Sequence, residues 1–104
     1  MYDTALFEQF IKDIRVTDLG QKVVIDCLPS APFDNDEVYQ FVCLKCEKIT
    51  INCREQVKNY IAEYGCIDLI EFSVSKQENN KIGVYIYGRG VLLDVLCQEI
   101  EIIK

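Results

Sequence analysis

Near the start of the chain, apolar residues recur at every third or fourth position, and charged residues fill positions between them. The apolar positions between Asp3 and Ile14 are Leu6, Phe7, Phe10, Ile11 and Ile14. This spacing places them on one face of an α-helix, with Asp3 or Thr4 as its N-cap. The pattern therefore predicts an amphipathic helix over Asp3 to Ile14 that packs one stripe against a sheet.

A second stripe of helical spacing follows residue 55 and comprises Val57, Tyr60, Ile61 and Tyr64. Signals at both ends support it. The segment from Asn52 to Glu55 resembles a capping box, and Gly65 stands where a left-handed C-cap belongs. These features predict a second helix that ends at Gly65.

Six other segments are predicted as strands: 14–17, 22–28, 38–52, 70–75, 82–87 and 91–103. In 70–75 and 82–87 apolar residues alternate with other residues with a period of two, which is typical of strands. Within the third segment the alternation changes phase, and we expect a bulge or tight turn near Glu47 to reconcile its two parts. In the last segment the alternation slips near Gln98.

Short polar segments separate these strands. Residues 18–21, 77–80 and 88–90 have the length of hairpin turns, and residues 30–37 have loop composition. Hairpin turns join antiparallel neighbours, because parallel strands need long crossover connections. We therefore predict a single α+β domain over residues 1–104, with two helices and an antiparallel sheet of six to seven strands.

Composition narrows the function. The chain has 104 residues, no histidine, no tryptophan and a formal net charge of -6. Histidine is the commonest general base and metal ligand, so its absence disfavours an enzyme. Negative charge opposes binding to a phosphate backbone, since nucleic-acid affinity comes largely from lysine and arginine. The composition favours a protein that binds a basic partner, with no cofactor and no direct contact with nucleic acid.

The length of the apolar stretches and the charges near the amino terminus predict where the protein is located. Apolar stretches without a charge are far shorter than the roughly 20 residues that span a bilayer. Asp3 and Glu8 occupy the amino-terminal region, where a secretion signal would have a basic region followed by an apolar core. We therefore expect a cytoplasmic protein that does not bind a membrane.

The six cysteines are Cys27, Cys43, Cys46, Cys53, Cys66 and Cys97. Disulfide frameworks belong to secreted domains too small to form a core, so we expect free thiols. Cys43 and Cys46 have the C-x-x-C spacing of a zinc knuckle or redox site, which makes a zinc-binding or thiol-redox domain an alternative function. No second C-x-x-C pair completes such a site, and residues 41–44 form an apolar run in which cysteine packs as a small hydrophobe. Our leading expectation contains no metal site.

Asp34, Asp36 and Glu37 form an acidic cluster in the predicted loop. The cluster lacks the glycine and the distant bidentate glutamate of an EF-hand calcium loop. A solvated turn accounts for it structurally. If it is functional, docking of a basic partner is the better interpretation, because fixed negative charge steers association.

Three further positions are candidate binding residues. Tyr85 and Tyr87 lie on the face of their strand opposite its isoleucine and valine residues, where they are interface anchors if exposed and core residues if a helix covers them. Asp94 interrupts the apolar run 91–96, so it faces a partner or pairs with a lysine. Arg89 lies between two glycines without a following helix, which favours a hairpin turn over a phosphate cradle.

A resemblance to a known group of proteins lies in an early helix followed by three segments: residues 22–27 (KVVIDC), 39–51 (YQFVCLKCEKITI) and 84–102 (VYIYGRGVLLDVLCQEIEI). In style and order they resemble small bacterial immunity proteins of polymorphic toxin and contact-dependent inhibition systems. The resemblance implies a sheet-rich cytoplasmic inhibitor of a cognate toxin, often a basic nuclease, with no catalysis and no cofactor. Some of the proteins that it resembles have a histidine near the first strand, which this chain lacks.

Charge, missing catalytic residues and this resemblance lead to one hypothesis: an immunity protein whose carboxylates substitute for the phosphates of a nuclease substrate. Its expected contacts are Asp34, Asp36, Glu37, Tyr85, Tyr87 and Asp94. Besides the zinc or thiol-redox domain, two alternatives stay open. One is a phage-encoded inhibitor of a host nuclease, and the other is a homo-oligomer subunit whose last strand pairs edge to edge. The sequence leaves the oligomeric state open.

Overall fold

The computed structural model describes residues 10–28 and 39–103, which form eight strands and one α-helix. The elements are β1 (Phe10–Thr17), β2 (Lys22–Leu28), β3 (Tyr39–Leu44), β4 (Lys48–Cys53), α1 (Gln56–Tyr64), β5 (Ile67–Lys76), β6 (Ile82–Gly88), β7 (Val91–Cys97) and β8 (Glu99–Ile103), with single 3-10 turns at Asp18–Gly20 and Glu78–Asn80. All strand pairs are antiparallel, and their order is β4-β7-β6-β5-β1-β2-β3-β8. The predicted antiparallel sheet is confirmed. The described residues contain more strands than the six to seven predicted, and one α-helix where two were expected.

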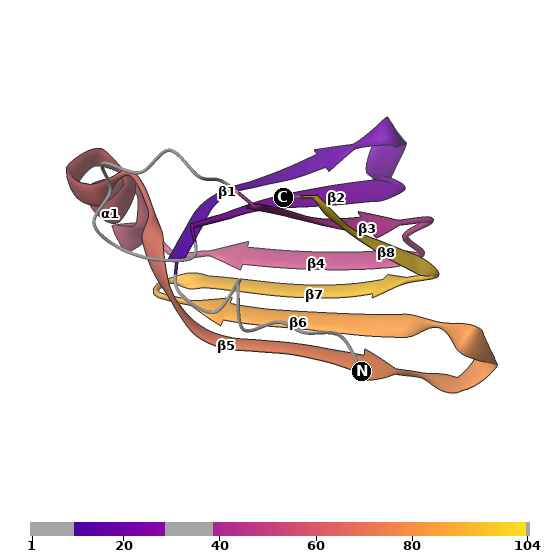
Figure 1. Ribbon diagram of the computed structural model, residues 1–104. Helices are drawn as coiled ribbons and strands as arrows, with labels where there is room; N and C mark the ends of the chain where they lie inside the picture. The colour runs from indigo at the N-terminus through magenta and orange to yellow at the C-terminus, as the bar shows by residue number, and fades with distance from the viewer. Residues whose placement is uncertain (1–9, 29–38, 104) are drawn as a thin grey trace.

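The sheet consists of two halves, β1-β2-β3-β8 and β4-β7-β6-β5 (Figure 1). They join through a short pairing of β1 with β5, in which Phe10 is opposite Asp68 and Ile11 is opposite Ile67. Helix α1 lies at this end of the molecule (Figure 1). Side chains from both halves contribute to a single buried apolar cluster. The two halves therefore act as two layers around one core.

At the end opposite α1, two reversals of the chain connect the halves (Figure 1). β3 passes into β4 through residues 45–47, and β7 passes into β8 through Gln98. The reversals are bonded to each other: Glu47 N–H donates to Leu96 O (2.8 Å), and Gln98 N–H donates to Leu44 O (3.2 Å). Strands β3 and β4, paired with β8 and β7, thus form one antiparallel ribbon that folds over. The tight turn expected near Glu47 is confirmed. Residues 91–103, expected as one long strand, are instead two strands that separate at Gln98, where the alternation slips.

The helix predicted over residues 3–14 is wrong in its second part, which belongs to β1. The register of β1 against β2 shifts between Ile11 and Asp13. Because of this bulge, Ile11 and Ile14 both pair with buried residues of β2, although they are three positions apart. A bulged strand therefore reproduced the spacing of a helical stripe. Residues 3–9 of the prediction lie outside the described residues.

The second predicted helix is confirmed as α1. Gly65 is its left-handed C-cap, with φ of 74°. The predicted capping box is wrong, because Asn52 belongs to β4 and the N-cap is Glu55, whose side chain makes no capping bond. Instead, Arg54 N–H donates to Gly90 O (2.7 Å) and ties the start of the helix to the β6–β7 turn. In the described part of the chain, no helix is long and apolar enough to cross a membrane.

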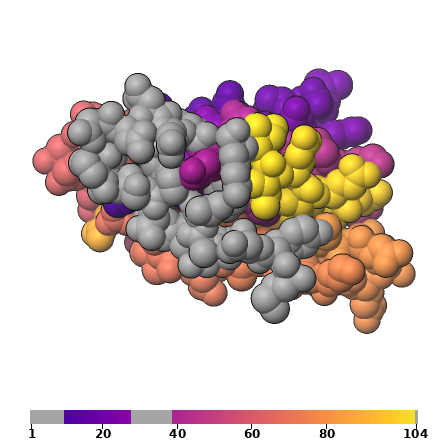
Figure 2. All heavy atoms as spheres, in the orientation of Figure 1, coloured from indigo at the N-terminus to yellow at the C-terminus, as the bar shows by residue number. Residues whose placement is uncertain are grey.

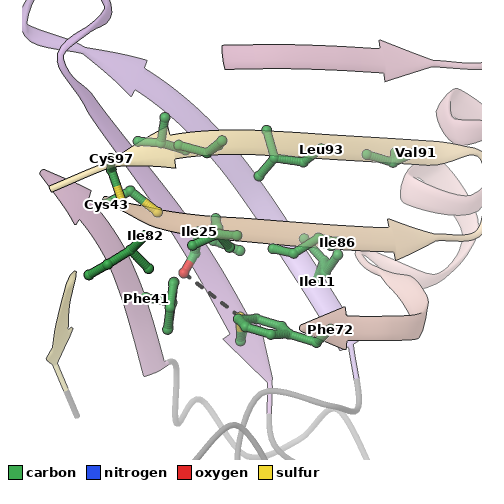
Figure 3. Packing of buried hydrophobic residues seen from close by; sticks show 14 of the residues in the cluster. Ile11, Ile25, Phe41, Cys43, Phe72, Ile82, Ile86, Val91, Leu93 and Cys97 are labelled. Carbon is green, nitrogen blue, oxygen red and sulfur yellow. Dashed lines mark hydrogen bonds between the residues drawn. The ribbon is translucent and has the colours of Figure 1, made fainter. Parts of the chain in front are cut away.

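Among the residues that the structure describes, Phe41 of β3 is the largest that is fully buried. Figure 3 shows it within the apolar cluster. Its ring meets the ring of Phe72 of β5 edge to face, with centroids 5.0 Å apart and planes at 83°. Cys43 of β3 and Cys97 of β7 are also fully buried, and their sulfur atoms point toward one another (Figure 3). Each pair joins the two halves of the sheet, so the packing of the two layers depends on these side chains.

The ends of the strand order are β4 and β8. Figure 2 shows residues 99–103, in yellow, on the visible surface, and Ile103 is 42% exposed. Among the described strands, β8 pairs only with β3 and β4 pairs only with β7. The homo-oligomer hypothesis, in which the last strand pairs edge to edge, therefore has an edge strand at the expected position.

Candidate protein-binding face

Alternation along β6 and β7 separates their side chains into a core face and an outer face. The buried apolar positions are Ile82, Val84, Ile86, Val91, Leu93, Val95 and Cys97. Tyr85, Tyr87 and Asp94 occupy the intervening positions, so their side chains project from the outer face of the half-sheet β4-β7-β6-β5. The predicted alternation is confirmed, and it places these three residues on one face.

Strand register brings these residues together. Tyr85 is the cross-strand partner of Asp94, and Tyr87 is the partner of Leu92. Side chains at directly opposed positions of an antiparallel pair lie about 5 Å apart at their Cβ atoms. We call the surface formed by Tyr85, Tyr87, Leu92 and Asp94 the outer face patch.

The polar groups of the outer face patch are available for contacts. Tyr87 is 39% exposed, Asp94 is exposed and Tyr85 is half-buried. Neither phenol hydroxyl forms a hydrogen bond within the described structure, and the Asp94 carboxylate there has no hydrogen bond or ion pair. The patch thus combines partly exposed aromatic area with unused hydrogen-bonding groups, as interface anchors do.

The other predicted contacts, Asp34, Asp36 and Glu37, lie outside the described residues. So do Asp3 and Glu8. Five of the 17 acidic residues, but only one of the 11 basic residues, fall outside the described ranges. Four of the six net negative charges therefore belong to these parts of the chain.

A concave region, which the sequence analysis does not predict, lies where α1 meets β5. Its volume is about 390 Å³, and it is lined by Tyr60, Tyr64, Cys66, Ile67, Asp68 and Arg89. Arg89 Nε and Nη2 are each 3.1 Å from Asp68 Oδ2, and the guanidinium carbon is 5.5 Å from the centre of the Tyr60 ring. Arg89 is thus paired within the chain, in the predicted hairpin turn. No local pattern could reveal this cluster, because its members come from separate elements.

The described cysteines are all free, as predicted. A hydrogen bond with Cys97, followed by burial, raises the pKa of the Cys43 thiol well above its usual range, and Cys46 Sγ donates to Cys43 O (3.5 Å). Cys53 is exposed at the far end of β4. Within residues 10–28 and 39–103, no group of three or more histidine, cysteine, aspartate or glutamate residues could hold a metal ion. Cys43 is fully buried in the apolar cluster, where its side chain packs as a small hydrophobe.

The buried Cys27 thiol gives a prediction about alkaline stability. Burial, with a smaller contribution from Asp26, raises the pKa of Cys27 from 9.0 to about 12. The unfolded chain loses this proton above pH 9, whereas the folded chain keeps it until about pH 12. The stabilisation is therefore fully present below pH 9 and decreases as pH rises to 12, by about 1.4 kcal/mol per pH unit.

Urea unfolding in reducing buffer between pH 7 and 11 tests this expectation, with Cys27→Val as the matched variant. The free energy of unfolding should fall more steeply above pH 9 for the wild type than for the variant. Parallel curves would show that the thiol of Cys27 contributes nothing to the loss.

Comparison with known proteins adds information on the fold. No family model matches the chain, and no curated protein is similar to it at a significant level. A solved structure of an uncharacterized protein from Neisseria gonorrhoeae is similar, with a TM-score of 0.57 and 11% identity. The match covers 91% of this chain and 89% of that chain. At this identity the likeness shows a shared fold alone.

Proposed function

We propose that this protein is a cytoplasmic immunity protein that binds and neutralises a cognate toxin domain, and that the outer face patch is its docking surface. The toxin in this proposal is a basic protein of the nuclease class. The supporting observation is that Tyr85, Tyr87 and Asp94 share one sheet face and that their polar side-chain groups form no hydrogen bond or ion pair with other described residues. The fold by itself serves many functions, so the proposal depends on this surface.

The chemistry of the patch suits a protein partner. Tyrosine brings a large rigid area with a hydroxyl group at low entropic cost, and it is enriched among residues that dominate binding energy. Leu92 lies opposite Tyr87 and adds partly buried apolar area beside it. Asp94 adds a carboxylate that can receive a lysine or arginine from a basic surface.

The net charge supports the same proposal at longer range. A chain with a formal charge of -6 attracts a basic partner and raises the rate of encounter, an effect that salt weakens. Binding then blocks the toxin by covering the surface that would meet nucleic acid. In this mechanism the inhibitor's carboxylates take the places of substrate phosphates, and the inhibitor itself carries out no chemical step.

Co-expression with basic nuclease toxins, beginning with any that is encoded beside its gene, tests the proposal. We expect the chain to restore growth of cells that produce the toxin, and purified chain to bind the toxin with a dissociation constant in the nanomolar range. Raising the salt concentration should slow association more than it speeds dissociation. A neighbouring toxin that neither binds the chain nor loses toxicity in its presence would contradict the proposal.

A further inference from the structure

We propose that a hollow beside Asp94 on the outer face is a subsite for an arginine side chain of the partner. This inference rests on the proposed function, in which the outer face patch is the docking surface, and it specifies the chemical group of the partner that binds there. The hollow has a volume of about 320 Å³ and is lined by Lys48, Thr50, Gln77, Gly83, Asp94, Val95 and Leu96. It adjoins Tyr85, the cross-strand partner of Asp94.

The absence of a side chain at Gly83 shapes one wall of the hollow. A Cβ atom at this position would lie 3.0 Å from Gln77 Nε2 and 3.2 Å from Ser75 Oγ. Both distances are shorter than ordinary van der Waals contacts. Glycine therefore lets Gln77 lie across β6, where its Nε2 donates to Ser75 Oγ (2.8 Å).

Three side chains around the hollow, Asp94, Gln77 and Thr50, offer acceptor oxygens. Asp94 supplies two carboxylate oxygens, and Gln77 supplies an amide oxygen, while its amide nitrogen donates one bond to Ser75 Oγ. The Thr50 hydroxyl, directly opposite Asp94 on β4, can also accept. A group of acceptors around a carboxylate favours a cation with several N–H donors.

Arginine meets these requirements better than lysine. Its guanidinium presents five N–H donors in a planar fork that can bond a carboxylate at two points, and it stacks on aromatic rings. Tyr85, next to Asp94, provides such a ring. A lysine ammonium has three donors and no plane to stack, so it would use fewer of the groups around the hollow.

Lys48 supplies the opposing charge. It lies opposite Leu96, one step along the outer face from the pair of Thr50 with Asp94. The structure shows no ion pair between Lys48 and Asp94, although both line the hollow. Its ammonium should disfavour an incoming cation, so removing this charge should strengthen the binding of arginine.

Nuclear magnetic resonance with ¹⁵N-labelled protein tests the subsite without the toxin. The probe is N-acetyl-arginine amide, with N-acetyl-citrulline amide as its neutral isostere and N-acetyl-lysine amide as the ammonium control. We expect the arginine probe to shift the backbone amide signals of Gly83, Tyr85 and Asp94, with a dissociation constant on the order of millimolar. Lysine amide should bind several-fold more weakly, and citrulline amide should cause no shift.

Two surface variants should change the affinity for the arginine probe in opposite directions. Asp94→Asn should weaken the arginine probe about fivefold or more, and Lys48→Gln should tighten it about two- to threefold. The spectra themselves report whether each variant is folded. Equal binding to the wild type and Asp94→Asn, or shifts spread over the whole surface, would overturn the subsite.

The outcome separates the subsite from the proposed function. If the arginine probe fails to bind but the toxin is neutralised, the subsite is wrong and the function stands. If the probe binds as expected but no toxin does, the subsite stands and the immunity function is wrong.

Discussion

Replacing Phe41 with alanine is expected to lower the free energy of unfolding by about 3–5 kcal/mol. The ring is fully buried and contacts Phe72 across the two halves of the sheet. Its removal loses the transfer free energy of the side chain and the aromatic contact. The cavity that it leaves lowers the stability further. Since natural domains are stable by roughly 5–15 kcal/mol, this change should bring the molecule close to unfolding.

Urea unfolding followed by circular dichroism measures this effect. Ile70→Ala is the matched control, because Ile70 is 60% exposed in β5 and its truncation should change stability by no more than about 0.5 kcal/mol. Phe41→Leu should fall between the two variants, since it keeps much of the apolar volume. A Phe41→Ala variant as stable as Ile70→Ala would contradict the proposed role of this ring in joining the layers.

The double substitution Tyr85→Ala/Tyr87→Ala is expected to weaken toxin binding at least roughly 100-fold, which corresponds to about 2.7 kcal/mol. Both side chains belong to the outer face patch, and neither phenol group has a bonding role inside the described structure. The fold should therefore survive their truncation. Calorimetry or surface plasmon resonance gives the affinity, and thermal unfolding checks the fold.

Tyr64→Ala is the control for this prediction. Tyr64 is 52% exposed and lines the concave region between α1 and β5, away from the outer face patch. Its truncation should leave the affinity within about twofold of wild type, because surface substitutions outside an interface have small effects. If Tyr64→Ala abolished binding and the double variant did not, the docking surface would be the α1 end.

The local sequence pattern is sufficient to predict a strand where that strand keeps one register along its length. The strand over residues 22–28 was predicted with its observed bounds, and the changes of phase near Glu47 and Gln98 located the two reversals. The pattern misled at Ile11 and Ile14, where a bulge brings two residues three positions apart toward the same partner strand. Periodicity alone cannot distinguish that arrangement from a turn of helix.

Some features of the candidate site also follow from local sequence pattern, and others do not. Alternation predicts that Tyr85 and Tyr87 share a strand face opposite the isoleucine and valine residues, but it leaves open whether a helix covers that face. The structure leaves Tyr87 and Asp94 exposed and Tyr85 half-buried. The hollow beside Asp94 depends on the pairing of β4, β6 and β7, and the Arg89 cluster depends on α1 meeting β5. Those juxtapositions come from long-range pairing, which a local pattern does not contain.

The folded-over ribbon has a consequence for how fast the molecule forms. Gln40 pairs with Ile103 and Leu44 pairs with Glu99, so stretches more than fifty residues apart must meet. Closing such a loop costs chain entropy that is recovered only once the ladder has formed. Proteins dominated by distant strand pairing fold in milliseconds to seconds, against microseconds for helical bundles. Newly made chains therefore pass through a slow interval in which β3 lacks β8 and β7 lacks β4. The unpaired edges of β3 and β7 are where premature association between molecules would begin.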